Sequence, residues 1–388
     1  MSDSTCFSGY RRENGTVGIR NHVLILPLDA VSYSVCRAVN SIVSGTSTFY
    51  HPYGRMQFGA DLDLHFRTLI GCGKNPNVAA VIVLGIEDEW TSKIAEGISS
   101  AGKPVAKFST SGNGELKTIE AASRKAVQFV KWATSLKREE ASISELTVGL
   151  KCGESDTTSG IASNPAVGVV ADRLAAAGSN MFFGETPELT GAENVVASRF
   201  ATKELQDEFL KIWQEYFDFV MSKGVDLLGS QPNEGNIAGG ITTIEEKALG
   251  NIQKLGTSKI VGILDTCEIP NGGSRGLYFM NTSSAAAEIL TAFCAGGAQV
   301  SLFTTGKGNN VGNPLCPTVK ICGNAQACLD SSENIDVDVS AITEGKMSLS
   351  EAADLILKET LHVSSGKLTA AEILKHNEFA PIRLFPQA

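Results

Sequence analysis

The sequence lacks features that mark several classes of protein. No run of five lysines and arginines occurs, and 42 acidic residues outnumber 33 basic ones, which gives a formal net charge of −9. This balance argues against nucleic acid as a partner. No stretch approaches the roughly 18 apolar residues of a membrane span, and the N-terminus lacks the pattern of a signal peptide. We therefore expect no membrane association and a cytoplasmic location.

Metal-cluster and nucleotide motifs are also missing. The nine cysteines include no CxxC pair, and the spacing of Cys316, Cys322 and Cys328 fits neither zinc ribbons nor ferredoxins. In a chain without a signal peptide, scattered cysteines are expected to be reduced thiols. Neither a Walker A loop nor an early GxGxxG segment occurs, which argues against nucleotide binding.

What is present is an alternation of strands and helices along 388 residues, long enough for two to three domains at roughly 150 residues each. Apolar runs predict strands at 21–28, 78–85, 104–109, 146–150, 180–183, 260–264 and 299–304. Helical spacing predicts helices at 91–101, 118–136, 164–177 and 204–222, and a helical tail after 349. This order predicts an α/β fold of two doubly wound domains with mainly parallel sheets. A charged segment at 137–144 is interpreted as a linker between domains 1–138 and 145–388.

Polar side chains follow several of the predicted strands, where an open parallel sheet binds its ligands. They are Glu89, Cys152, Asp156, Glu185 and Glu268. Carboxylates and thiols repeated at four strand ends suggest a cation site. The alternative is that these residues cap helices or interact with helix dipoles in the first turn.

His51 stands between aromatic residues and is followed by a proline. Imidazole is a common metal ligand and a common base near neutral pH, so His51 is a candidate for either role. A structural histidine is the alternative.

Two glycine-rich loops could hold an anion. Residues 304–314 contain Lys307 and Asn309, and residues 271–276 contain Arg275. Glycines let backbone N–H groups approach an oxyanion closely, and the two cations would add charge. Plain structural turns are the alternative.

Taken together, these segments resemble the altronate and galactarate dehydratase family, which are metal-dependent hydro-lyases of sugar acids. The match begins at 9–21 (GYRRENGTVGIRN), where the family has a G-[FY]-x-R-x-[DN]-G-x-x-G-x-R-N signature. It continues at 68–71, 75–80, 152–156, 159–160, 164–166, 185–188, 191–193, 232–236, 238–243, 295–297, 304–308 and 336–342.

The resemblance implies Fe²⁺ or another divalent cation and an anionic small-molecule substrate. The implied metal ligands are His51, Cys152, Asp156, Glu185 and Glu268. The implied substrate-binding residues are Arg55, Arg275, Lys307 and Asn309. His51 and Glu89 are the leading candidates for the general base, which the sequence does not identify.

Two departures from the family pattern modify this expectation. Family members carry an additional small N-terminal domain or work with it as a separate subunit, so we expect this chain to be a large subunit with a small partner. The family segments HxxGC and GxGCE read here as His51 to Arg55 and Gly85 to Glu89, so that an arginine and Asp88 replace two thiols.

Arg55 suits a sulfonate, because a guanidinium makes charge-assisted contacts with oxyanions. The resemblance therefore implies a carbon–sulfur lyase that removes the α-proton of (2R)-3-sulfolactate, stabilises the enolate with a metal, and releases sulfite and pyruvate. A sugar-acid hydro-lyase that forms a 2-keto-3-deoxy acid is the alternative. A non-catalytic metabolite-binding subunit is a third reading, which the many strand-end carboxylates disfavour.

Overall fold

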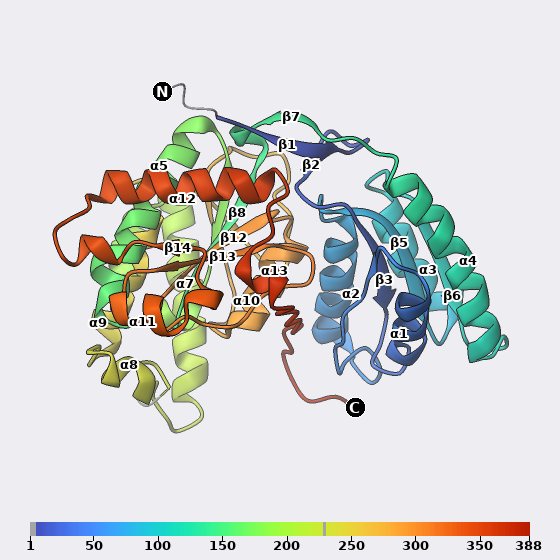
Figure 1. Ribbon diagram of the computed structural model, residues 1–388. Helices are drawn as coiled ribbons and strands as arrows, with labels where there is room; N and C mark the ends of the chain where they lie inside the picture. The colour runs from blue at the N-terminus through green and yellow to red at the C-terminus, as the bar shows by residue number, and fades with distance from the viewer. Residues whose placement is uncertain (1–4, 228–229) are drawn as a thin grey trace.

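Three β-sheets organise the chain in a computed structural model that describes residues 5–227 and 230–388. A seven-stranded parallel sheet has the order β10-β11-β9-β8-β12-β13-β14, and a four-stranded parallel sheet has the order β4-β3-β5-β6. An antiparallel sheet, β2-β1-β7, lies above both of them (Figure 1). The α/β class with mainly parallel sheets is thereby confirmed.

The strands of the seven-stranded sheet are β8 (Thr147–Gly153), β9 (Asn180–Phe183), β10 (Ile260–Leu264), β11 (Leu277–Met280), β12 (Val300–Thr305), β13 (Thr318–Cys322) and β14 (Val337–Asp338). The four-stranded sheet contains β3 (His22–Pro27), β4 (Thr46–Ser47), β5 (Val78–Gly85) and β6 (Val105–Ser109). The antiparallel sheet contains β1 (Cys6–Arg11), β2 (Val17–Gly18) and β7 (Glu139–Ser142).

The helices of the first part are α1 (Tyr33–Ile42), α2 (Gly59–Lys74), α3 (Asp88–Ser99) and α4 (Glu115–Ala133). Those of the second part are α5 (Asn164–Ala177), α6 (Glu193–Ala197), α7 (Lys203–Met221), α8 (Glu234–Ala238), α9 (Ile244–Asn251), α10 (Ala286–Ala295), α11 (Ala325–Asp330), α12 (Leu349–Ser364) and α13 (Ala370–Ile373). No helix in the described part of the chain is both long and apolar enough to cross a membrane.

The strands and helices predicted from apolar runs and helical spacing are confirmed, with shifts of a few residues at their ends. The segment 137–144 differs from its prediction. It contains β7, which pairs antiparallel with β1, so part of the expected linker is an edge strand. Its polar residues fit that place, because Glu139 and Glu140 are exposed.

The strands of both parallel sheets begin near the antiparallel sheet and point away from it. β3 begins shortly after β2, and β8 begins shortly after β7. The carboxyl ends of their strands therefore face the same side of the molecule, the lower side in Figure 1. Ligand-binding residues of both sheets are expected on this side.

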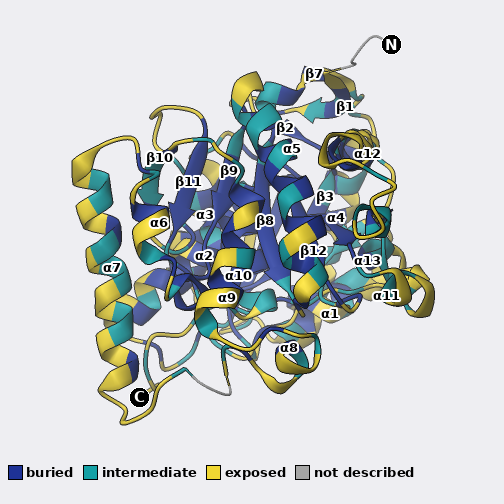
Figure 2. Ribbon diagram, turned by 90° about the vertical axis from the view of Figure 1, so that its left-hand side faces the viewer, coloured by how far each residue is buried: buried dark blue, intermediate teal, exposed yellow. Residues whose placement is uncertain are grey.

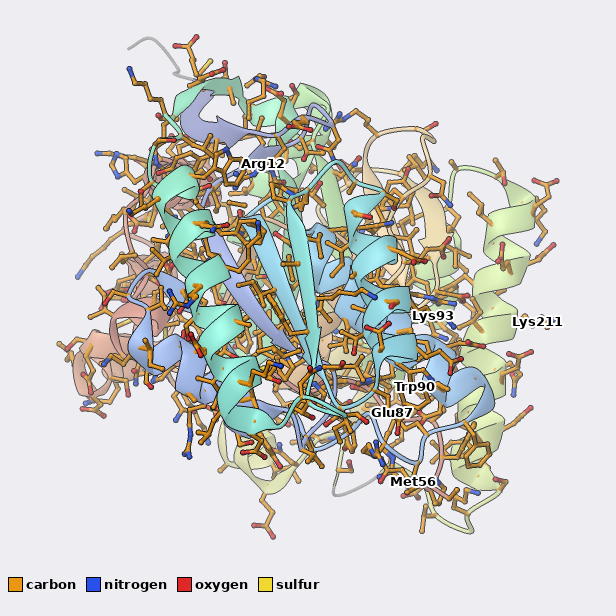
Figure 3. All side chains as sticks on the ribbon, turned by 90° about the vertical axis from the view of Figure 1, so that its right-hand side faces the viewer. Arg12, Met56, Glu87, Trp90, Lys93 and Lys211 are labelled. Carbon is orange, nitrogen blue, oxygen red and sulfur yellow. The ribbon has the colours of Figure 1, made fainter. Side chains whose placement is uncertain are left out.

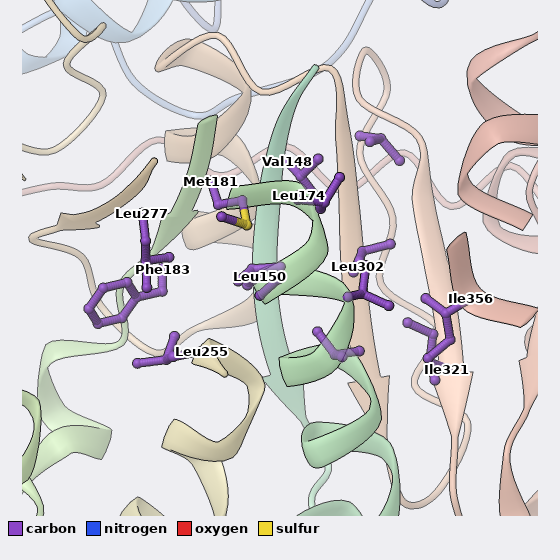
Figure 4. Packing of buried hydrophobic residues seen from close by; sticks show 14 of the residues in the cluster. Val148, Leu150, Leu174, Met181, Phe183, Leu255, Leu277, Leu302, Ile321 and Ile356 are labelled. Atoms are coloured by element: carbon purple, nitrogen blue, oxygen red, sulfur yellow. The ribbon is translucent and has the colours of Figure 1, made fainter. Parts of the chain in front are cut away.

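Helices cover both faces of the seven-stranded sheet. Leu150 of β8 shares a buried cluster with Leu174 of α5 (Figure 4). A Cβ atom on its neighbour Gly149 would lie 2.6 Å from the ring of Phe293, which belongs to α10. Because successive strand residues face opposite sides, α5 and α10 lie on opposite faces. Figure 2 shows the strands as the buried centre and α7 as a largely exposed outer helix.

The two parallel sheets share a core at the contact between α2 and α10. Gly71 of α2 is required there, since a Cβ atom would lie 2.3 Å from the Ala295 carbonyl oxygen. The Asn75 amide donates to the carbonyls of Cys294 (2.7 Å) and Ala298 (2.8 Å). Asn77 donates in the same way to two further carbonyls of the second part. The family segments at 68–71 and 75–80 therefore join the two parts.

Candidate active site

Three non-glycine residues with positive φ follow strands of the seven-stranded sheet. They are Glu154 (φ 51°) after β8, Glu185 (φ 67°) after β9 and Cys267 (φ 64°) after β10. Such conformations persist only where the surroundings fix them, and they concentrate at functional sites. The carboxyl edge of this sheet is therefore the first place to look for chemistry.

A polar cleft of about 460 Å³ opens at this edge. Its lining comes from the β8 loop, from the start of α8 and from the β12 loop: Glu154, Asn233, Glu234, Gly235, Asn236 and Lys307. The backbone of Gly235 approaches the Lys307 amine so closely that a Cβ atom would lie 3.4 Å from it. The cleft thus offers one cation and two carboxylates, a combination that can bind an anion and accept a proton.

Asp156 lies beside this cleft under the glycine-rich loop. A Cβ atom on Gly306 would lie 2.3 Å from the Asp156 carboxyl carbon, so the loop needs glycine at this position. The carboxylate accepts hydrogen bonds from Ser159 N (3.0 Å), Thr158 Oγ1 (2.6 Å) and Asn324 Nδ2 (2.7 Å). Both of its oxygens have protein partners, and Asp156 orders the loops around the cleft.

Cys152 lies deeper, at the end of β8. Its thiol is 1% exposed and lies 2.7 Å from the Ser155 hydroxyl. The amide of Asn164 donates to the same sulfur at 3.5 Å.

Glu185 is fully buried between two lysines. Its carboxylate accepts from the Lys151 amine of β8 and, at 2.6 Å, from Lys254 Nζ. Burial raises the pKa of Glu185, but the positive charges of Lys151 and Lys254 outweigh it and hold the pKa below its usual 4.5. Glu185 therefore remains ionised as the partner of two lysines.

Another buried lysine contacts a residue that lines the cleft. Lys247 of α9 lies 3.6 Å from the Glu188 carboxylate and donates to Asn236 Oδ1 at 3.1 Å. Asn236 in turn donates to the Ser155 carbonyl at 2.8 Å. These contacts fix α8 against the loop that follows β8.

Lys320 of β13 supports the glycine-rich loop from below. Its amine donates to the Asn309 carbonyl (2.8 Å), to Asn309 Oδ1 (3.3 Å) and to the Val311 carbonyl. Burial lowers the pKa of Lys320 to about 7. Asn309, predicted to bind substrate, thus has its side-chain oxygen directed to Lys320.

Three predicted residues lie instead in the loop and helix regions around the four-stranded sheet. His51 is fully buried, and Arg55 lies 3.4 Å from Glu87 with 42% of its side chain exposed. Glu89 is exposed in the first turn of α3. Figure 3 labels Glu87 and Met56, and Met56 is the next residue after Arg55 in the chain. Both labelled residues lie at the lower end of this sheet. Gly54, between His51 and Arg55, has φ 105° and packs against Leu28 and Asp29.

Glu268 follows β10, which is three strands away from β8. At about 4.8 Å per strand, this separation is on the order of 14 Å. Its carboxylate accepts the Asp265 backbone N–H at 2.8 Å and closes a local turn. Glu268 therefore does not join Cys152 and Asp156.

Arg275 lies at the opposite edge of the sheet. It precedes β11 and donates to the backbone carbonyls of Gly178 (2.6 Å) and Ser144, which precede β9 and β8. Arg275 and Lys307 therefore lie at opposite edges of the sheet, because the loop from β10 to β11 crosses from one edge to the other.

The five implied metal ligands do not form one site. Within residues 5–227 and 230–388, no three histidine, cysteine, aspartate or glutamate side chains are placed to hold a metal ion. Glu185 is engaged with lysines, Glu268 lies in a distant turn, and His51 belongs to the other parallel sheet. The donor set implied by the resemblance therefore does not fit a common metal centre.

The sequence analysis missed the buried bases of this region. They are Lys151, Lys247, Lys254 and Lys320, and a further buried base, His65, lies on α2 beside the four-stranded sheet. Two of them could have been noticed, because Lys151 and Lys320 interrupt apolar strands, where a lysine needs a partner.

Comparison with known proteins identifies the class. The signature of D-galactarate/altronate dehydratases, C-terminal domain, matches residues 143–387. The signature of the second domain of D-galactarate dehydratase/altronate hydrolase matches residues 9–134. The chain belongs to this family of lyases.

Among individual relatives, the (2R)-sulfolactate sulfo-lyase subunit beta of Chromohalobacter salexigens is 51% identical over 384 residues, which cover 98% of both chains. The altronate dehydratase of Bacillus subtilis is 30% identical over 99% of this chain and 78% of its own length. The altronate dehydratase of Escherichia coli is 29% identical over 97% of this chain and 77% of its own length.

Replacing Glu185 should destabilise the protein. At pH 7, Glu185→Gln should lower the free energy of unfolding by about 3 to 5 kcal/mol, because two buried lysines lose their counter-charge. The folded-state pKa of Glu185 is lowered, so its contribution is present above pH 4.5 and is lost as the pH falls through the folded-state value. The difference between variant and wild type should therefore shrink in acid.

Urea unfolding followed by circular dichroism at several pH values measures this difference. Glu208→Gln, on the exposed side of α7, is the matched control and should change stability little. Equal stability of Glu185→Gln and wild type at pH 7 would contradict the account.

Proposed function

We propose that this chain is the large subunit of a lyase that converts (2R)-3-sulfolactate into pyruvate and sulfite. The observation that carries the proposal is the 51% identity, over 98% of both chains, to a protein named as a sulfolactate sulfo-lyase subunit. The identity to altronate dehydratases is about 30%. Those relatives share the elimination chemistry but act on a different substrate, as their names state.

The cleft at the carboxyl edge of the seven-stranded sheet is the proposed substrate site. Sulfolactate carries a carboxylate and a sulfonate, and the Lys307 ammonium in the cleft would contact one of these groups. The glycine-rich loop that carries Lys307 is held from below by Lys320. Lys307 is thus positioned by the fold before substrate arrives.

Glu154 is the proposed acceptor of the α-proton. It lines the same cleft on strained backbone, and its exposed carboxylate can approach a bound substrate. Removal of the proton leaves the electron pair on C2, which forms the C2–C3 double bond as the C3–S bond breaks. Sulfite departs with the bonding electrons, and the enol tautomerises to pyruvate. A metal ion has no assigned step, because the predicted ligands do not form one site.

The partner and the compartment belong to the same proposal. The relative in C. salexigens is named as a subunit, which supports a separate small subunit for this chain. A cytoplasmic location is supported by nine cysteines that are all free thiols.

Sulfite release tests the function directly. The chain, co-expressed with its small partner and reconstituted anaerobically with Fe²⁺, should produce equal amounts of pyruvate and sulfite from sulfolactate. Altronate and galactarate are assayed in parallel. Formation of a 2-keto-3-deoxy acid from either sugar acid, with no sulfite from sulfolactate, would instead establish the hydro-lyase.

Loss of the cleft cation should weaken substrate binding. Lys307→Met should raise KM for sulfolactate by about tenfold or more, because a charge-assisted contact is lost. Lys211→Met on the exposed face of α7 removes the same charge far from the cleft and serves as the control. An unchanged KM in Lys307→Met would remove Lys307 from the site.

A further inference from the structure

Two of the nine free cysteines meet at the carboxyl edge of the seven-stranded sheet. Cys322 is the last residue of β13, and Cys328 lies in α11, six residues further along the chain. Cys328 Sγ lies 3.8 Å from the Cys322 carbonyl oxygen, and the two thiols interact directly. In the sequence, this spacing stood out only as a poor match to metal clusters.

One thiol is held by the sheet and the other by a short exposed helix. Cys322 is 0% exposed and pairs with Asp338 of β14. A Cβ atom on Gly323 would lie 2.9 Å from the side chain of Ala162, so the backbone directly after Cys322 is closely packed. α11 has six residues, and none of them is buried. A small movement of α11 can therefore bring the Cys328 sulfur to the Cys322 sulfur without disturbing the sheet.

The two thiols differ in acidity. The contact with Cys328 lowers the pKa of the Cys322 thiol below its usual 9.0, against the opposing effect of burial. The pKa of Cys328 is raised, mainly by the same contact with Cys322. Cys328 is half-buried, so solvent reaches the pair from the side of α11. An acidic thiol beside a second, accessible thiol is the arrangement of a redox-sensitive pair.

We propose that Cys322 and Cys328 form a reversible disulfide bond when the protein meets hydrogen peroxide. The Cys322 sulfur attacks one peroxide oxygen, so that an S–O bond forms and the O–O bond breaks with loss of hydroxide. The Cys328 sulfur then attacks the resulting sulfenic acid, the S–S bond forms, and the S–O bond breaks with loss of a second hydroxide. The two thiol protons convert both hydroxides to water, so two thiols are oxidised as one peroxide is reduced.

The disulfide would enclose Asn324, which connects α11 to the loops around the cleft. Asn324 Oδ1 accepts from the backbone N–H groups of Gln326 (3.0 Å) and Ala327 (3.2 Å), which begin α11. Its Nδ2 donates to the Asp156 carboxylate at 2.7 Å. The modification thus lies beside the cleft, and no step of the proposed reaction uses either thiol. Formation of the disulfide does not depend on the proposed function.

A second pair of cysteines in the same chain provides a comparison. Cys72 of α2 and Cys294 of α10 also interact, and this contact raises the pKa of Cys294 well above its usual value. Both residues are 0% exposed in the core that joins the two parallel sheets. Because peroxide cannot reach them while the protein is folded, this pair should stay reduced.

Peptide mapping of the full chain, co-expressed with its small partner, tests the proposal. After exposure to hydrogen peroxide, the remaining thiols are alkylated in denaturant and the protein is digested with trypsin. Both thiols of the proposed disulfide lie in one tryptic peptide, 321–346, because no lysine or arginine lies between them. This peptide should have lost two hydrogen atoms and escaped alkylation, and dithiothreitol should restore both alkylation sites. Cys72 and Cys294 should be alkylated with or without peroxide.

Single variants separate the roles of the two thiols. Cys328→Ser should leave a sulfenic acid on Cys322 that a cyclic diketone traps. Cys322→Ser should slow the oxidation of Cys328 by about tenfold or more, because the more acidic thiol is lost. Cys6→Ser, which removes an exposed thiol on β1, is the control and should leave the disulfide intact.

Two results would overturn the proposal. One is alkylation of both thiols in peptide 321–346 after peroxide treatment. The other is a disulfide from either of them to a different cysteine. Failure of the sulfolactate assay would not affect these measurements, because they are made without substrate.

Discussion

The burial of Glu185 between Lys151 and Lys254 is the constraint on which the candidate site depends. Three charges removed from water are tolerated only when each has a close partner. The three charged residues come from three places: β8, the second residue after β9, and the helical turn Ile252–Leu255. The carboxyl edge of the sheet therefore has one arrangement in which these charges are satisfied. Glu154, which lines the cleft, follows Lys151 by three residues in the chain.

A second set of buried hydrogen bonds holds the segments that line the cleft. Lys247 and Asn236 fix α8 to the Ser155 carbonyl, and Lys320 fixes the loop that carries Lys307. The cleft is thus lined by loops, and buried lysines hold those loops to strands. Such support allows loop residues to keep strained conformations, as Glu154 does with φ 51°.

Much of the fold could be predicted from the sequence, because apolar runs such as Val78–Gly85 are buried throughout. The neighbourhood of Lys307 and Asp156 was predictable too, since both directly follow strands of one parallel sheet. The position of Arg275 could not be predicted from the sequence. A connection between two parallel strands runs from one edge of the sheet to the other, and the sequence does not show at which edge a given residue of the connection lies. Glu185 has a side chain that commonly binds metal ions. Its contacts with Lys151 and Lys254 are seen only in the folded structure, because these residues are far apart in the sequence.

The family segments divide into structural and chemical roles. Asn75, Asn77 and Gly71 join the two parallel sheets through backbone contacts. Arg20 holds the C-terminal region through Glu372 at 2.7 Å. The segments around Glu154 and Lys307, in contrast, line an open cleft. We infer that the first group preserves the fold of the family, and that the second group serves the elimination chemistry that its members share.

The most direct test of this account is a structure of the two-subunit complex with an unreactive sulfolactate analogue. The account predicts that one anionic group of the analogue contacts Lys307 and that C2 faces the Glu154 carboxylate. An analogue bound at Arg55, in the loop between β4 and α2, with the cleft at Lys307 left empty, would contradict it.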